Sequence, residues 1–174
     1  MKDKLKIFCH EVNQRISKPW VADGFVFATN GSVLIRIPGP IDGVEGLLNA
    51  VDAMKVFQET PEPKEWFPVP DVTPPEEPKE KACDECDGKG ETECRTCGQD
   101  AECPECEGTG KIIPKMIISP IEIGGFCFSN LYLHQIKTCF PDAEIGPTEY
   151  PKPARLRFTG GDGLICLSKP PLEA

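Results

Sequence analysis

The chain has 174 residues, of which 39% are hydrophobic, and it carries a net charge of −9 at pH 7. This length allows one domain of ordinary size and a small module, with enough apolar residues to bury a core. No run of about 18 uncharged apolar residues occurs, and the start lacks the apolar run and cleavage site of a signal peptide. We therefore expect a cytoplasmic protein whose ten cysteines are reduced.

Residues 1–60 are predicted to form the first half of a folded scaffold. Apolar residues from Leu5 to Ile16 recur at helical spacing, which predicts a helix of about three turns. Short β-prone runs separated by Asp-Gly and Asn-Gly then predict a three-stranded meander over residues 20–37, because these dipeptides favour tight hairpins. A further apolar pattern over residues 47–57 predicts a second helix.

Residues 61–82 are predicted to be an acidic, proline-rich linker. Seven prolines lie between Pro61 and Pro78, which favours a stiff, extended segment without regular secondary structure. The pair Trp66-Phe67 interrupts this segment. It either packs on the scaffold or contacts a partner, and we favour packing because aromatic residues in a linker often anchor the linker to a folded surface.

Residues 83–110 hold most of the cysteines, arranged as CxxC pairs. The six cysteines are Cys83, Cys86, Cys94, Cys97, Cys103 and Cys106. A CxxC turn directs both sulfurs at one ion, and the glycines of a CxxCxGxG unit permit positive φ and let backbone amides approach the thiolates. We therefore predict a zinc module with these six cysteines as metal ligands. Four thiolates complete a structural zinc site, so two of the six cysteines remain outside a first site.

Residues 111–174 are predicted to form the second half of the scaffold. Strands are expected at 115–118 and 121–123, a helix after the N-cap Ser129, and three further strands at 143–145, 154–158 and 164–167, with a turn at 160–163. Each half then consists of a helix followed by three strands, and the second half is also preceded by a strand. The cysteine module is inserted between the two halves.

Two segments of the scaffold match a known architecture. Residues 27–37 read Phe-Ala-Thr-Asn-Gly-Ser-Val-Leu-Ile-Arg-Ile, and residues 154–167 read Ala-Arg-Leu-Arg-Phe-Thr-Gly-Gly-Asp-Gly-Leu-Ile-Cys-Leu. They resemble two hairpins of the bacterial DNA sliding clamp, the polymerase III beta subunit. The resemblance implies an α+β fold, a single clamp-like domain of two (β)αβββ halves with an inserted small zinc-knuckle module. A clamp ring needs several such domains, and this chain offers one.

The cysteine segment contains two full CxxCxGxG units, at residues 83–90 and 103–110. These units resemble the zinc region of DnaJ co-chaperones. The resemblance implies that Cys83, Cys86, Cys103 and Cys106 share a primary zinc site, with Cys94 and Cys97 at the tip of the intervening loop. That middle pair could complete a second site with other ligands, share zinc across a dimer, or form a redox pair. A pairing of Cys94 and Cys97 with one neighbouring unit also stays open. No J domain is evident, so the resemblance does not imply co-chaperone activity.

Outside the module the sequence favours structural roles over catalysis. Four single cysteines stand among apolar residues and are predicted to fill the core: Cys9, Cys127, Cys139 and Cys166. His10 and His134 are expected on helices as core or surface side chains and not as metal ligands. The sequence has no Walker loop, no GxSxG motif and no convincing paired carboxylates, so we predict that the protein is not an enzyme.

The negative charge is concentrated in one part of the chain. Residues 61–111 hold 15 Asp and Glu against 6 Lys and Arg, whereas the rest of the chain is balanced. Such a module favours a basic or DNA-binding surface of a protein partner, and direct nucleic-acid binding is expected to be weak. A basic lining would arise only if Arg36, Lys137, Arg155 and Arg157 shared a face. The sequence is also compatible with a homo-oligomer.

These features predict a non-catalytic zinc-binding protein that acts by macromolecular interaction. By analogy of architecture, it would be an accessory or inhibitory protein of a phage or mobile element, linked to DNA transactions. One alternative is an acidic DNA mimic that blocks a host DNA-binding protein. The other is a zinc-knuckle module that binds nucleic acid or peptide.

Overall fold

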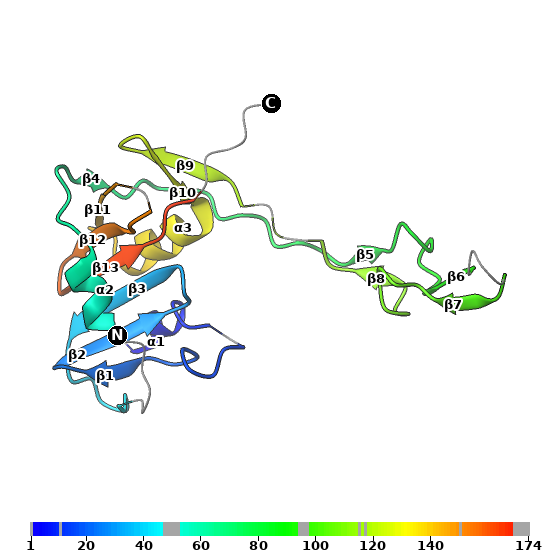
Figure 1. Cartoon of the computed structure of the whole chain (residues 1–174), viewed down its shortest axis with the longest axis horizontal. Helices are drawn as coiled ribbons and strands as arrows, with labels where there is room; N and C mark the ends of the chain where they lie inside the picture. Colours follow the sequence, from blue (N-terminus) through cyan, green and yellow to red (C-terminus); the bar gives the residue numbers. More distant parts are fainter. Residues whose placement is uncertain are drawn as a thin grey trace. The chain divides into compact units, whose positions relative to one another are not determined.

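The computed structural model describes residues 2–10, 12–46, 53–93, 98–114, 116, 118–149 and 151–168. The chain divides into two compact units (Figure 1). Unit 1 combines Met1–Pro74 with Ile118–Ala174, and unit 2 is Pro75–Ile117. The fold is mixed α/β with mainly sheet and few helices. Within the described residues, none of the helices has the length and apolar character needed to cross a membrane.

Unit 1 is built on a seven-stranded antiparallel sheet with the order β1-β2-β3-β13-β12-β11-β4. Its strands are β1 (Trp20–Ala22), β2 (Phe25–Thr29), β3 (Val33–Pro38), β4 (Phe67–Pro68), β11 (Glu144–Gly146), β12 (Ala154–Phe158) and β13 (Gly161–Ile165). The meander predicted over residues 20–37 is confirmed. Asp23 and Gly24 both have positive φ, as the tight hairpin between β1 and β2 requires.

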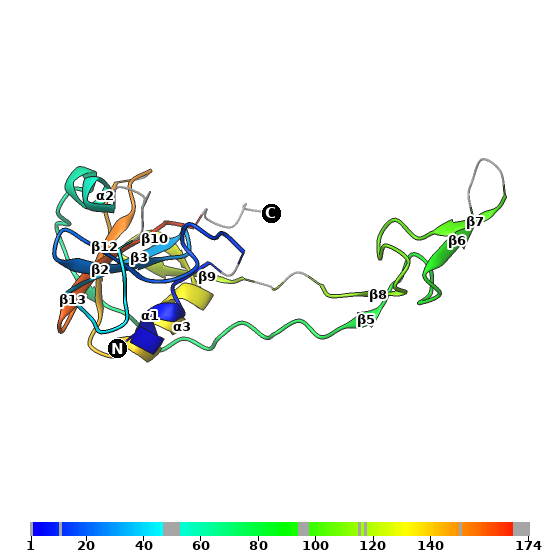
Figure 2. The same cartoon turned by 90° about the horizontal axis from the view of Figure 1, so that it is seen from below.

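The sheet buries side chains on both faces. Helices α1 (Lys2–Lys6) and α3 (Asn130–Cys139) lie on one face, and α2 (Ala53–Glu59) lies on the other (Figure 2). Along β3 the residues Val33, Ile35 and Ile37 join the core under α1 and α3, whereas Leu34 packs in the smaller core under α2. The alternation follows from the two-residue period of a strand, and it gives each helix an apolar surface to cover.

The two halves of unit 1 have matching element orders. Helix α1 is followed by β1, β2 and β3, and helix α3 is followed by β11, β12 and β13. The last strands of the halves, β3 and β13, pair with each other at the centre of the sheet. The predicted order of one helix and three strands per half is therefore confirmed.

The first helix is much shorter than the sequence predicted. A helix over residues 5–16 is wrong, because α1 ends at Lys6 and Val12 is 84% exposed. The His10 ring accepts hydrogen bonds from the backbone amides of Val12 and Asn13. This side chain satisfies amides that a continuing helix would have paired with carbonyls, so it favours a turn.

Residues 61–74, here called the strap, belong to unit 1 and pack on its sheet. The expectation that this stretch forms no regular element is wrong, because Phe67–Pro68 form β4 and pair with β11 at the edge of the sheet. The Val69 amide donates to the Ala143 carbonyl, and Val72 O lies 3.1 Å from Nδ1 of His134. The Arg157 guanidinium covers the Trp66 ring at 4.3 Å, so the favoured packing of the aromatic pair is confirmed.

The second half differs from the prediction at its ends. Strands β9 (Pro120–Ile123) and β10 (Phe126–Ser129) form a hairpin, and only the first of these was predicted. Ser129 occupies the N-cap of α3 as expected, although its side chain makes no capping hydrogen bond. Strand β13 begins at Gly161, so the turn lies earlier than predicted, at residues 159–160. Lys115, Ile117 and residues 47–52 lie outside the described residues. Parts of the strand predicted at 115–118 and of the helix predicted over 47–57 therefore lie outside them as well.

Unit 2 consists of two short antiparallel strand pairs that bracket the cysteines. Strand β5 (Lys81–Ala82) pairs with β8 (Lys111–Ile112), and β6 (Glu91–Glu93) pairs with β7 (Asp100–Glu102). Ion pairs Lys81–Asp84 (2.6 Å) and Glu80–Lys111 (2.7 Å) lie at the β5–β8 end.

Candidate metal centre

Four cysteine sulfurs converge in unit 2 and can hold a metal ion. The Sγ atoms of Cys83, Cys86, Cys103 and Cys106 all lie within 4.8 Å of one another, and all four residues are buried. Two of the separations are 3.9 Å, between Cys83 and Cys103, and 3.7 Å, between Cys86 and Cys106. Four sulfurs at this spacing enclose one ion and leave no place for a further ligand from solvent.

The four cysteines come from two backbone turns of the same form, here called the first knuckle (residues 83–90) and the second knuckle (residues 103–110). In each knuckle the amide five residues after the first cysteine donates to that cysteine's carbonyl: Gly88 to Cys83 and Gly108 to Cys103. The knuckles also bond to each other reciprocally, since the Cys83 amide donates to Gly110 and the Cys103 amide to Gly90. The repeat in sequence therefore becomes an approximate two-fold repeat in structure.

Glycines at the end of each knuckle permit this interlocking. Gly90 and Gly110 have φ of +82° and +72°, which L side chains rarely adopt. A Cβ on Gly90 would collide with the Gly108 carbonyl oxygen, and a Cβ on Gly110 would collide with that of Gly88. The second glycine of CxxCxGxG is thus required by the contact between the two knuckles as well as by the local turn.

Backbone amides donate to two of the sulfurs. The Gly90 amide lies 3.2 Å from Sγ of Cys86, and the Gly110 amide lies 3.3 Å from Sγ of Cys106. Burial raises the pKa of the Cys83 thiol to about 11. Burial acts in the same direction at Cys86, but the Gly90 amide and the neighbouring thiols outweigh it and lower that pKa to about 7. Metal binding at such a site displaces thiol protons, so metal affinity rises with pH.

Of the six predicted ligands, the structure brings together Cys83, Cys86, Cys103 and Cys106. Cys94 and Cys97 lie outside the described residues, so their role stays a prediction. Ile112 packs against the cluster and was not singled out from the sequence. Its position two residues after the second knuckle is the only signal that could have identified it.

The remaining predicted residues are distributed over unit 1. Cys139 is buried as expected and Cys9 and Cys127 are partly buried, but Cys166 is exposed, so core filling is wrong for Cys166. It directly follows β13, and because alternate residues point to opposite faces, Cys166 is exposed although the preceding Ile165 is buried. His134 lies on α3 as predicted, whereas His10 lies beyond the end of α1 and outside any helix.

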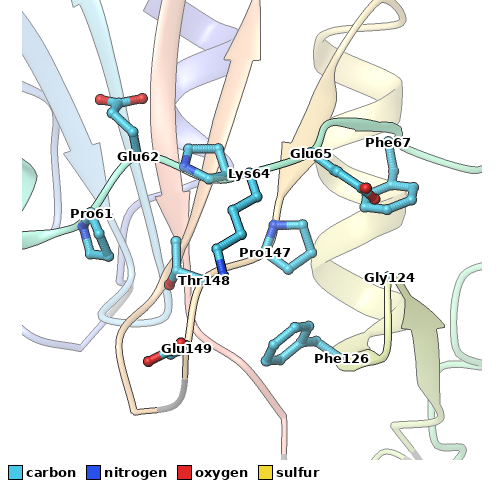
Figure 3. A pocket seen from close by; sticks show the side chains of 11 residues that line it. Pro61, Glu62, Lys64, Glu65, Phe67, Gly124, Phe126, Pro147, Thr148 and Glu149 are labelled. Atoms are coloured by element: carbon cyan, nitrogen blue, oxygen red, sulfur yellow. The ribbon is translucent and has the colours of Figure 1, made fainter.

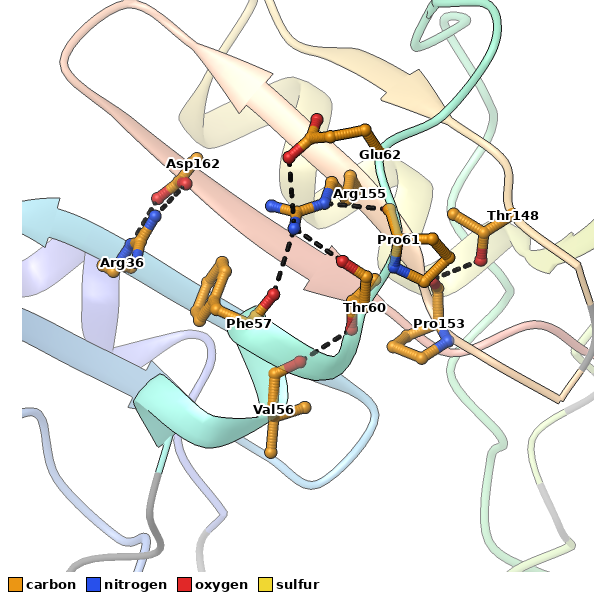
Figure 4. A network of polar contacts seen from close by, with 10 residues as sticks. All are labelled: Arg36, Val56, Phe57, Thr60, Pro61, Glu62, Thr148, Pro153, Arg155 and Asp162. Carbon is orange, nitrogen blue, oxygen red and sulfur yellow. Dashed lines mark hydrogen bonds and ion pairs between the residues drawn. The ribbon is translucent and has the colours of Figure 1, made fainter.

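The arginines considered for a basic lining are already paired, and Figure 4 shows two of them, Arg36 and Arg155, with their partners. Arg36 forms a two-pronged ion pair with Asp162 and lies over the Phe57 ring at 4.0 Å. Arg155 donates to the carbonyls of Phe57, Thr60 and Pro61, at the end of α2, and pairs with Glu62 at 3.2 Å.

Arg157 pairs with Glu144 at 2.5 Å. Lys137 lies on α3, on the opposite face of the sheet from α2, so the four predicted residues do not share a face. The arginines instead fix α2 and the strap to the sheet.

Comparisons with protein-family models, with curated protein sequences and with solved structures gave no match. The resemblances to the sliding clamp and to the DnaJ zinc region therefore stay predictions.

Proposed function

We propose that this chain is a non-catalytic zinc protein in which the metal centre holds an acidic module that binds a basic surface of a partner protein. The observation that carries the proposal is the closed set of four buried sulfurs. A tetrahedral zinc with metal–sulfur bonds of about 2.3 Å separates its sulfurs by about 3.8 Å. The separations of 3.7 and 3.9 Å fit this geometry. A catalytic zinc would need an open position, which four thiolates do not leave.

The charge on the module indicates the class of partner. In the β6–β7 hairpin Glu91 lies directly opposite Glu102, and Glu93 directly opposite Asp100. Because alternate residues of a strand share a face, the four carboxylates lie on one face of the hairpin. Like charges directly opposite each other destabilise a strand pair. Among the described residues no ion pair neutralises any of the four, so a basic partner would relieve the repulsion.

Direct nucleic-acid binding is not part of this proposal. Phosphate binding depends on lysines and arginines that release counterions, and Arg36, Arg155 and Arg157 are engaged within unit 1. We expect duplex DNA to bind no more tightly than the weak end of the non-specific range, about 10⁻⁴ M at physiological salt. Submicromolar binding of DNA at that salt would favour the nucleic-acid-binding alternative.

The wider setting, an accessory or inhibitory protein of a phage or mobile element, belongs to the same proposal. It rests on the resemblance of residues 27–37 and 154–167 to clamp hairpins, and the repeated order of one helix and three strands in unit 1 is compatible with it. The alternative is an acidic DNA mimic that occupies the DNA-binding surface of a host protein, and the concentration of negative charge in residues 61–111 favours it.

The proposal is tested first by native mass spectrometry of protein prepared without chelator. We expect bound zinc in the wild type, loss of that zinc in Cys106→Ser, and retention in Cys166→Ser, which removes an exposed cysteine outside the cluster. A second measurement compares capture of partners from cell extract by the wild type and by Glu91→Gln/Glu93→Gln/Asp100→Asn/Glu102→Gln. The variant with four amides should fail to capture the specific partner, and added salt should release that partner from the wild type. Absence of zinc from the wild type, or identical capture by both proteins, would refute the proposal.

A further inference from the structure

Unit 1 contains an open groove of about 580 Å³, a volume in the range of binding pockets (Figure 3). Three segments form it: residues 61–65 and 67 of the strap, residues 124 and 126 at the β9–β10 hairpin, and residues 147–149 after β11. These segments are far apart in the sequence, and all of them belong to unit 1.

The walls of the groove are fixed by contacts with the sheet. Arg155 donates to the Pro61 carbonyl at 3.0 Å, and β4 holds Phe67 opposite Ile145. The Phe67 ring packs against Gly124 so closely that a Cβ there would lie 2.7 Å from the ring. On the third side, the buried Thr148 hydroxyl donates to the Pro153 carbonyl at 2.8 Å. A groove held in this way is preformed, which lowers the cost of ordering it on binding.

The groove has an apolar surface and an acidic rim. Phe67, Phe126 and Pro147 line it and are each partly exposed. Glu65 and Glu149 are exposed at its edge, and within the described part of the chain neither forms an ion pair. An apolar surface with carboxylates beside it fits a ligand that carries an apolar side chain next to a cation.

The chain itself places a cation in this groove. Figure 3 shows the side chain of Lys64 extending from the strap across the groove toward Thr148. Lys64 is exposed and attached to a flexible four-carbon stem, so a lysine or arginine of a partner can displace it at little cost.

We propose that this groove is a docking site for an extended segment of a partner protein in which a large apolar residue is flanked by Lys or Arg. The apolar side chain would contact Phe126 and Pro147, and the flanking cations would pair with Glu65 and Glu149. This site involves unit 1 alone and does not depend on the metal centre. It therefore adds a second contact with a basic partner, separate from the acidic face of the β6–β7 hairpin.

The test uses the full chain and a fluorescent synthetic peptide in which lysines flank a central leucine. Binding should shift the amide resonances of Gly124, Phe126 and Thr148 and should persist after the metal is removed by chelation. Glu149→Lys should weaken binding about fivefold, because it replaces an attraction at the rim with a repulsion. Lys64→Ala should strengthen binding about twofold to threefold, a gain that misfolding would not produce.

Two controls separate docking from general charge attraction. Glu122→Lys makes the same change in charge at an exposed position of β9 outside the groove and should alter binding by less than twofold. A peptide with glutamates in place of the lysines should not bind. The inference is overturned if the three amides do not shift, if Glu122→Lys and Glu149→Lys have equal effects, or if the glutamate peptide binds as well. Loss of binding on chelation would also overturn it, by assigning the peptide to unit 2.

Discussion

The two units of this chain are stabilised by different means. Unit 1 has apolar cores on both faces of its sheet, and these include fully buried side chains such as Phe128, Leu133 and Ile145. In unit 2 the described residues form one buried cluster, which consists of the four cysteines with Ile112 packed against it. A segment of this size buries too little apolar surface to fold without a disulfide, a metal or a partner. From this comparison we expect that unit 1 folds by apolar burial and that unit 2 depends on metal binding.

The charges of the two units differ for a related reason. In unit 1 the arginines are used internally, and Arg36 and Arg155 each bond to groups within the fold. In unit 2 most carboxylates are exposed, and the hairpin places four of them in opposed pairs. A unit with such an acidic surface stays folded only if another interaction outweighs the repulsion between its carboxylates. Metal binding by the four cysteines is the strongest interaction that unit 2 offers.

The largest expected effect is that of metal removal. Chelation with EDTA should unfold residues 83–110, because structural zinc contributes about 10–16 kcal/mol to small zinc modules. Unit 1 should keep its structure, since none of its core residues belongs to the cysteine cluster. The measurement is a pair of ¹H–¹⁵N NMR spectra, in which amides of the knuckles should lose dispersion while those of the sheet stay in place.

A reciprocal control weakens unit 1 alone. Phe128→Ala removes a fully buried ring and should lower the stability of unit 1 by about 3–5 kcal/mol, while the metal stays bound. If chelation instead abolishes the melting transition of unit 1, or if Phe128→Ala releases the metal, the two units do not fold independently and the comparison is wrong.

An intermediate effect is expected from the interlocking of the knuckles. Gly90→Ala introduces a Cβ that collides with the Gly108 carbonyl at a residue with φ of +82°, and it should cost about 2–4 kcal/mol of metal binding. Gly98→Ala is the matched control, because φ there is +69° but the nearest atom to the added Cβ is a Glu93 carboxylate oxygen at 3.5 Å. Gly98→Ala should cost about 1 kcal/mol of metal binding.

Competition with a chromophoric chelator measures both zinc dissociation constants. Equal losses in the two variants would mean that backbone strain alone limits binding, and that the contact between the knuckles adds nothing.

Local patterns in the sequence were sufficient for much of this architecture. Asp23-Gly24 predicted the first hairpin because the turn needs two residues with positive φ. The CxxC spacing predicted six metal ligands, and they include the four sulfurs that meet. Residues 154–158 were likewise predicted as a strand and form β12, in which three of the five residues are buried in one core.

Other features depended on tertiary contacts that spacing does not reveal. The apolar residues from Leu5 to Ile16 match a helical pattern, but the His10 ring bonds to two backbone amides and favours a turn. The strap has the composition of a free linker, yet Arg157 covers Trp66 and β11 accepts Phe67 as an edge partner. The groove was not predictable, because its three walls come from separate parts of unit 1.

The smallest expected effect concerns a single carboxylate of unit 1, and it tests how little one charge contributes to the stability of that unit. The Thr159 hydroxyl and backbone amide hydrogen-bond to Asp142, with the amide 2.7 Å from Oδ2, and they hold the pKa of this carboxyl below its usual value. A carboxyl with a lowered pKa in the folded state stabilises the fold above its unfolded pKa, near 3.9, and this contribution is lost as pH falls through the folded value.

Asp142→Asn should therefore lower the melting temperature of unit 1 slightly at pH 7 and flatten its decline below about pH 4. Asp71→Asn, an exposed residue of the strap, controls for the change in net charge. Thermal melts of the three proteins between about pH 3 and 7 provide the measurement. A loss in Asp142→Asn that grows as the pH falls would contradict the assignment, because the hydrogen bonds would then favour the protonated carboxyl.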